Sequence, residues 1–263
     1  MIKKSPARKK PSNLFVIVRF FMHSLYGWSD SLLEEETVDR RSFQIFVEWT
    51  SADLVPNATT ICRYRELFSR LKLDDLLFRQ LKKQLKALGL ILGKGTWVDA
   101  TIKKAQANLS SKRNQDADDT QKGKKCYYGY KGYIGVDCQT QVIHDTTNIH
   151  NSTVFAELLS NTGQVVIGDK GYANQLRKSR LRSKGTYCGI LDKGYRNRKL
   201  SNKQRRRNQQ LSSIHDAVER PFAFMNHVLN YERCSYYNIA RNRFQFTKAV
   251  FIYNLRKMLV LTA

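Results

Sequence analysis

Two short apolar runs in this chain, Thr96-Trp97-Val98-Asp99 and Gln164-Val165-Val166-Ile167-Gly168-Asp169, each end on a carboxylate. Their β-branched and aromatic residues predict strands. A third acid, Glu219, lies in Ala217-Val218-Glu219-Arg220, a segment with a helical pattern further along the chain. Carboxylate oxygens are the ligands that Mg²⁺ prefers, and three carboxylates that converge can hold two ions for phosphodiester chemistry.

The composition indicates a folded protein with an anionic partner. The chain has 263 residues, of which 41% are hydrophobic, and its 46 Lys and Arg against 22 Asp and Glu give a net charge of +24. A charge of this sign attracts polyanions and drives salt-dependent binding to DNA or RNA. No apolar run approaches the roughly 18 residues that a membrane span needs, so we expect no membrane partner. The five cysteines form no CxxC pair, which favours free thiols and a cytoplasmic setting.

The pattern of apolar residues divides the chain into three parts. Residues 1–12 form a basic tail, and residues 13–93 have a helical pattern. Near residue 95 the period changes from that of helices to that of strands, so residues 94–263 are expected to form a second domain. Within it, residues 105–124 are polar and without periodicity, which predicts a long loop.

Capping residues and apolar stripes place the helices of the first domain. One helix is expected to begin with Ser29 or Asp30 as its cap, and another with Thr59 or Thr60. A long amphipathic helix is predicted for residues 71–90. The part before residue 94 is therefore predicted to be all-helical.

Strand and helix patterns alternate in the second domain. A strand at 97–102 precedes a hairpin whose strands cover 127–136 and 142–146. The elements that follow are a helix at 152–160, the strand that ends at Asp169, a strand at 186–191, the helix with Glu219, and a helix at 244–261. This order predicts an α/β fold with a mixed sheet flanked by helices. Asp99 and Asp169 can meet if their strands are neighbours, and a helix packed across the sheet can bring Glu219 to them.

Five sequence blocks resemble those of a known family. They are Pro-Asn-Ala-Thr-Thr-Ile (56–61), Gly-Thr-Trp-Val-Asp-Ala-Thr-Ile (95–102), Tyr-Gly-Tyr-Lys-Gly-Tyr-Ile-Gly-Val-Asp (128–137), Gly-Asp-Lys-Gly-Tyr (168–172) and Val-Glu-Arg-Pro-Phe (218–222). Each block is weakly specific, but five in this order resemble the insertion-sequence-five group of bacterial transposases. The resemblance implies the ribonuclease-H-like core of DDE transposases, and a helical N-terminal domain, residues 13–93, that contacts the ends of the element.

The resemblance also implies a site and a reaction. Asp99, Asp169 and Glu219 would be the catalytic and metal-binding acids of an Mg²⁺-dependent DNA transposase, with Mn²⁺ as the alternative ion. We expect Asp99 to bridge two ions, with Asp169 as a ligand to one and Glu219 to the other. The enzyme would cleave and join DNA phosphodiesters and so move an insertion sequence, a mobile element.

Three positions around Glu219 depart from a related pattern, Tyr-x2-Arg-x3-Glu-x6-Lys. They hold Ser212, His215 and Asn226. A lysine at the last position would contact the terminal phosphate of the DNA. The departures therefore favour an alternative function, a catalytically degenerate DNA-binding remnant of a transposase. Another Mg²⁺-dependent endonuclease is the third hypothesis.

Lysine and arginine dominate the segment 177–207, whose only acid is Asp192. Tyrosines interleave with them, which favours a face that follows phosphates, although a charge run can also be a solvated surface. The predicted DNA contacts are Lys131, Lys170, Arg177, Lys178, Arg180, Arg182, Arg205, Arg206, Arg207, His215, Arg220 and Asn226. The expected partner is double-stranded DNA, both terminal inverted repeats and target DNA, bound by a homodimer at the bacterial nucleoid.

Other acids compete for the site. Asp145, Asp137 and Asp192 also close strand-like runs, and Asp145 is the strongest rival. An aspartate at a strand end is also a common turn former. The sequence leaves the choice between these acids open.

Overall fold

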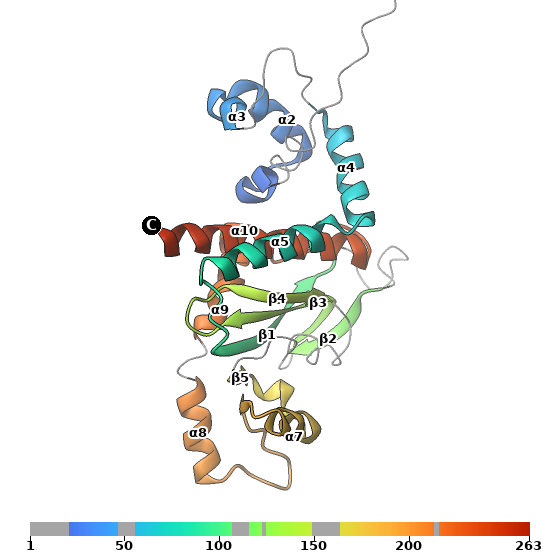
Figure 1. Cartoon of the computed structure of the whole chain (residues 1–263). Coiled ribbons are helices and arrows are strands. Elements are labelled where there is room, and N and C mark those ends of the chain that lie inside the picture. The colour runs from blue at the N-terminus through green and yellow to red at the C-terminus, as the bar shows by residue number, and fades with distance from the viewer. Residues whose placement is uncertain (1–20, 47–55, 107–115, 123–124, 149–163, 213–215) are drawn as a thin grey trace, which may run out of the picture. The chain divides into compact units, whose positions relative to one another are not determined.

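The computed structural model describes residues 21–46, 56–106, 116–122, 125–148, 164–212 and 216–263 (Figure 1). The chain forms two compact units, Met1–Leu73 and Asp74–Ala263. The division falls at the start of the long amphipathic helix, whereas the sequence pattern puts a boundary at residue 93. In the described ranges, no helix is both long and apolar enough to cross a membrane.

The first unit is built from short helices with polar caps. The helices are α2 (Asp30–Asp39), α3 (Arg41–Phe46) and α4 (Ala58–Arg70). Of the two caps predicted for α2, Ser29 is the one used, because its Oγ accepts the N–H of Leu32 at 3.1 Å. The cap of α4 is Asn57 rather than Thr59 or Thr60, since Asn57 Oδ1 accepts the N–H of Thr60 at 2.8 Å.

The second unit contains a six-stranded sheet. Its strands are β1 (Gly95–Lys104), β2 (Asp118–Lys122), β3 (Lys125–Asp137), β4 (Ile143–Asn148), β5 (Val165–Gly168) and β6 (Tyr187–Ile190). The order is β2-β3-β1-β5-β6, and β4 also pairs with β3. β1 is antiparallel to β3 but parallel to β5, which is parallel to β6. This mixed sheet confirms the predicted fold class and is consistent with the ribonuclease-H-like fold.

The hairpin prediction is confirmed, and one loop prediction is wrong. β3 and β4 pair antiparallel, with Gly132 opposite Asn148 and Gly135 opposite Asp145. Residues 118–122, predicted as loop, form β2 because their backbone pairs with the first half of β3. Residues 107–115 of that loop and the helix predicted at 152–160 lie outside the described residues.

Helices lie on both sides of the sheet in Figure 1, with α5 and α10 on one side and α7 on the other. They are α5 (Leu73–Ala87), α7 (Gln175–Ser183), α8 (Asn202–Ser212), α9 (Asp216–Ala223) and α10 (Ile239–Thr262). α5 packs against the second unit through Leu81 and Leu85, which contact Val142, just before β4, and residues of α10. α10 begins before its predicted start at residue 244, since Asn238 caps it by accepting the N–H of Arg241 at 3.1 Å.

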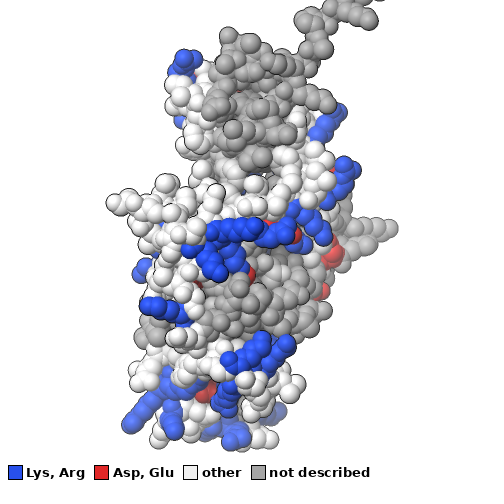
Figure 2. Space-filling model, viewed as in Figure 1, with Lys and Arg blue, Asp and Glu red and all other residues white. Residues whose placement is uncertain are grey.

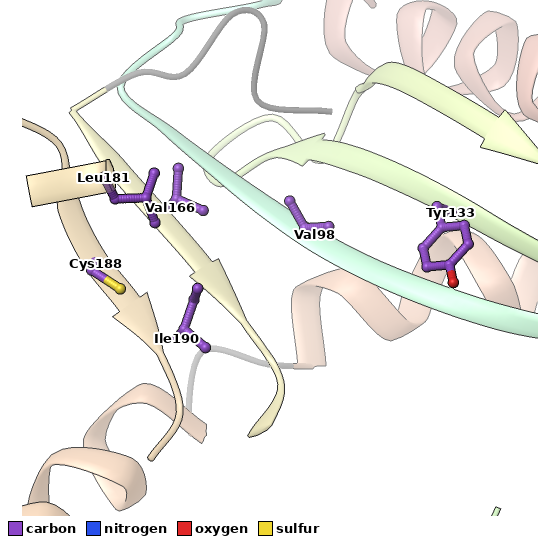
Figure 3. Close-up of a cluster of buried hydrophobic side chains, with 6 residues drawn as sticks. All are labelled: Val98, Tyr133, Val166, Leu181, Cys188 and Ile190. Atoms are coloured by element: carbon purple, nitrogen blue, oxygen red, sulfur yellow. The ribbon is translucent and has the colours of Figure 1, made fainter. Parts of the chain in front are cut away.

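A buried apolar cluster holds the central strands together (Figure 3). The cluster joins β1, β3, β5, β6 and α7 through Val98, Tyr133, Val166, Leu181, Cys188 and Ile190. Full burial of one such aliphatic side chain contributes about 1.5–3 kcal/mol. The cluster therefore fixes β1 against β5 at Val98, the residue immediately before Asp99.

Candidate active site

Asp99 and Asp169 come together because their strands are parallel neighbours. The register of β1 and β5 ends with Val98 opposite Gly168. One further residue in that register places Asp99 beside Asp169, with their Cα atoms roughly 5 Å apart. Asp99 lies in the middle of β1 rather than at its end, because β1 continues to Lys104 in pairing with β3. Asp169 follows β5 directly, as predicted.

Each of these carboxylates has one oxygen held by the next backbone N–H. Asp99 Oδ1 accepts from Ala100 at 2.7 Å, and Asp169 Oδ1 accepts from Lys170 at 2.6 Å. Asp169 is also the N-cap of η3, a short 3₁₀ helix at Lys170–Tyr172. Both aspartates are half-buried. The local backbone thus orients the two carboxylates without covering them.

Tyr172 lies close to both aspartates. Burial, the carboxylate of Asp99, Tyr133 and the carboxylate of Asp169, in that order, raise the pKa of Tyr172, while Arg177 lowers it. Two acids can act on one phenol only if both lie close to it. A tyrosine is protonated at neutral pH even with its ordinary pKa, and this raised pKa keeps the hydroxyl protonated at higher pH as well, so that it can donate a hydrogen bond beside the acids.

Glu219 is carried by α9, which packs against β1. Val218 is fully buried in this packing, whereas Glu219 is exposed. The helix continues as η4, a π-helix at Phe224–Val228, where Asn226 Oδ1 accepts from Lys103 Nζ at 2.6 Å. Because α9 packs on β1 and its continuation meets Lys103 near the end of that strand, α9 runs back along β1 toward its middle.

The spans of strand and helix that lead away from the Lys103–Asn226 contact are similar. Lys103 and Asp99 are four residues apart in one strand, about 13 Å, and their side chains share one face. Glu219 precedes Asn226 by about two helical turns, roughly 10 Å. The seven residues from Glu219 to Asn226 therefore span a length similar to the four residues from Asp99 to Lys103 on β1.

The acids fit a hard divalent cation, although they do not form a closed cluster. Among the described residues, no group of three or more His, Cys, Asp or Glu side chains is close enough to hold a metal ion. The pair at positions 99 and 169 supplies only oxygen ligands. Mg²⁺ and Mn²⁺ prefer such oxygen donors and retain open positions for a substrate.

The three rival acids have structural partners. Asp145 accepts from Lys82 Nζ at 2.7 Å and is 2.8 Å from His144 Nδ1. Asp137 accepts backbone N–H groups with both oxygens, from Leu92, Gly93, Gln139 and Thr140. Asp192 pairs with Lys178 at 2.5 Å and with Arg207 at 3.1 Å. These contacts account for the rivals as structural groups.

The predicted DNA contacts fall into several environments. Lys131 is opposite Ile102, so its side chain lies on the face of the sheet away from Asp99. Arg207 donates hydrogen bonds to the carbonyl oxygens of Ile190 and Cys188, so its side chain links α8 to β6. The side chains that are exposed are Lys170, Arg180, Arg182, Arg205, Arg206 and Arg220, while Arg177, Lys178 and Asn226 are half-buried. His215 lies outside the described residues.

A cavity of about 370 Å³ has several basic residues in its wall. The first of its lining residues follow Asp169 closely in the sequence. Its wall begins at Ala173 and Asn174, just after η3, and includes Lys178 and Asp192. Further cations on the wall are Lys193, Arg198 and Lys199. Figure 2 shows lysine and arginine side chains gathered over the end of the molecule that holds α7 and α8. Anions are therefore attracted to the same edge of the sheet that carries Asp169.

Sequence reasoning missed Lys103, whose side chain is 2% exposed. In the sequence it is one of two adjacent lysines at the end of a strand, which is typical of a solvated strand end. The alternation of β1 was the available signal, because positions 97, 99, 101 and 103 share a face and Trp97 is buried on it.

Two family models match the chain. Residues 92–255 match the family described as "Transposase DDE domain", and residues 8–67 match the one described as "Transposase domain (DUF772)". The chain belongs to the transposases with a DDE domain, and it is a DNA transposase, an enzyme that cleaves DNA and transfers its strands. The predicted family is confirmed, while the insertion-sequence-five subgroup stays a prediction.

One solved structure resembles the chain distantly. It is described as the cryo-EM structure of the piggyBac transposase synaptic complex with hairpin DNA. The identity is 11% and the TM-score 0.47, over 100% of this chain and 70% of that chain. A likeness of this strength carries no argument about the site.

Proposed function

We propose that Asp99, Asp169 and Glu219 are the acids with which this transposase cuts and joins DNA at the ends of an insertion sequence. The observation that carries the proposal is the parallel register of β1 and β5, which runs to the residue before each aspartate. The position of Tyr172 within reach of both carboxylates supports it.

The acids would hold Mg²⁺, with Mn²⁺ as a substitute. When bound, a pair of such ions lowers the pKa of the attacking water or 3′-hydroxyl and stabilises the leaving oxygen. Asp99, being central, is proposed as the shared ligand, with Asp169 and Glu219 on either side. The N–H groups of Ala100 and Lys170 hold the aspartate carboxylates in orientation before DNA arrives. Tyr172 stays protonated and can donate to a phosphate oxygen.

The DNA partner is proposed to lie across the basic end of the sheet. Lys170 follows Asp169 and is exposed, and the cations around the 370 Å³ cavity continue from it. Arg205 and Arg206 on α8 present further exposed charge. Salt-dependent phosphate contacts of this kind position a duplex without reading its sequence. The specific substrates are the terminal inverted repeats and target DNA, bound by a homodimer in the bacterial cytoplasm at the nucleoid.

Cleavage of DNA that carries the ends of the element tests the proposal. We expect Mg²⁺-dependent cleavage by the wild type, lost by at least about a hundredfold in Asp99→Asn, Asp169→Asn and Glu219→Gln, with DNA affinity retained. Asp119→Asn, a change to an exposed acid on β2, is the matched control and should cleave normally. Full activity in the Asp99 or Asp169 variant would disprove the assignment.

The degenerate remnant remains the alternative that one observation favours. Asn226 stands where the related pattern has lysine, and its amide oxygen is engaged by Lys103 rather than available to DNA. Wild-type protein that binds the ends but nicks nothing with Mg²⁺ or Mn²⁺ would establish this alternative instead.

A further inference from the structure

Lys103 is an internal lysine with a specific set of contacts. Its side chain is 2% exposed, and Nζ donates to Asn226 Oδ1 at 2.6 Å and to the carbonyl oxygen of Tyr231. Nζ also lies 4.5 Å from the centre of the Tyr231 ring. Three separate contacts therefore hold one ammonium group between β1 and the chain that follows α9.

These contacts join the strand of Asp99 to the helix of Glu219. Asn226 lies in η4, the π-helical continuation of α9, and α9 contains Pro221. A π-turn shifts the residues after it relative to a regular helix, and such turns are frequent at functional sites. Met225, next to Asn226, is fully buried, so the rotation of this segment is fixed by packing as well as by Lys103.

We propose that Lys103 is a positioning residue that sets the register of α9 on β1 and thereby holds Glu219 over Asp99. This inference rests on the proposed function of the three acids. Burial decides between this role and a direct phosphate contact, because a lysine that is 2% exposed presents no charge to DNA. Asn226 is then the acceptor for a lysine supplied by the strand, where the related pattern has a lysine on the helix.

The chemistry of the position distinguishes this role from ordinary packing. A buried ammonium loses its hydration, and an apolar side chain of similar length would fill the space without that loss. Lysine differs from such a side chain because its Nζ donates hydrogen bonds to one amide oxygen and one carbonyl oxygen at the same time. These two directional bonds fix the positions of both acceptors. Residues that hydrogen-bond metal ligands typically change metal affinity or activity by 10–100-fold when they are removed. Lys103 acts on Glu219 through Asn226 and α9, so its effect is expected at the lower end of that range.

The test compares Lys103→Met with Lys104→Met, the same change at the adjacent exposed lysine. We expect Lys103→Met to weaken Mn²⁺ binding, measured by calorimetry on the DNA-free protein, by about tenfold or more. Single-turnover cleavage should fall by a similar factor, and the Kd for DNA should change less than about twofold. Lys104→Met should match the wild type in all three.

A second pair of variants covers the case in which Lys103→Met does not fold. Asn226→Leu removes the acceptor at similar size and should lose Mn²⁺ affinity and cleavage, whereas Asn226→Asp keeps an acceptor and should lose clearly less. Equal losses in these two variants would overturn the proposal.

Two outcomes for folded Lys103→Met would also overturn it. One is wild-type Mn²⁺ binding and cleavage. The other is a tenfold loss of DNA affinity with Mn²⁺ binding unchanged, which would make Lys103 a DNA contact. Failure of the proposed function is recognised separately, because Asp99→Asn would then bind Mn²⁺ as the wild type does.

Discussion

The charge state of Lys103 makes the stability of this protein depend on pH in a predictable direction. Burial lowers the pKa of Lys103 to about 8, against opposing effects from Cys234 and Glu232 that raise it. In the unfolded chain the pKa has its ordinary value of 10.5. Between these two values the unfolded chain binds more protons at this site than the folded protein, so this contribution to stability rises as the pH rises.

The size of the effect follows from the same two pKa values. Holding Lys103 in the folded protein costs about 3 kcal/mol at pH 7 and about 1 kcal/mol at pH 10. The wild type should therefore gain about 2 kcal/mol over Lys103→Met between these pH values. Groups far from Lys103 that titrate in this range are common to both proteins and cancel in the difference. Cys234, whose pKa Lys103 lowers, is the exception.

Urea unfolding at pH 7, 8, 9 and 10 measures this difference directly. Lys104→Met is the control, because Lys104 is exposed and its unfolding free energy should follow the wild type at every pH. If the free energies of wild type and Lys103→Met stay within about 0.5 kcal/mol of a constant offset, Lys103 is not desolvated in the folded protein. The positioning role would then lose its physical basis.

Three further predictions concern packing and DNA binding. Gly132→Ala should destabilise the fold by about 1–3 kcal/mol in urea unfolding, because a Cβ there would lie 2.5 Å from the Phe246 ring; a neutral effect would show that α10 packs less tightly. Arg207→Ala should lower the free energy of unfolding by about 1–3 kcal/mol, because it removes the hydrogen bonds to two carbonyl oxygens. Arg206→Ala, at an exposed side chain, should change it by less than about 0.5 kcal/mol. A larger loss in Arg206→Ala than in Arg207→Ala would contradict these positions of the two side chains. DNA affinity, measured by fluorescence anisotropy, should fall steeply between about 50 and 200 mM salt. An affinity that stays constant over this range would contradict DNA binding through phosphate contacts with lysine and arginine.

Local patterns in the sequence were enough to predict most of the sheet. The hairpin of β3 and β4 and the strand before Asp169 follow from runs of β-branched and aromatic residues. The run Thr96-Trp97-Val98-Asp99 put Asp99 at a strand end, although residues 97–102 were also predicted as one strand. Pairing with β3 extends β1 beyond Asp99 to Lys104, and no local signal in the sequence indicates that pairing. β2 was missed for the same reason.

The proposed acids could be chosen from the sequence, but the residues that support them could not. Asp99 and Asp169 were recognisable because a carboxylate after an apolar run is unusual, and the register of their strands fits that choice. Lys103 and Asn226 are 123 residues apart in the chain, so their hydrogen bond depends on how α9 crosses the sheet. Likewise, only the folded protein could show that Asp145 is paired with Lys82 rather than available as a ligand.

Diffraction from crystals soaked with Mn²⁺, recorded for its anomalous signal, tests the central claim most directly. We predict a peak between the carboxylates of Asp99 and Asp169, with ligand oxygens at roughly 2 Å and Glu219 as the next nearest protein ligand. Mn²⁺ bound at Asp145, Asp137 or Asp192, with none at Asp99 and Asp169, would contradict it.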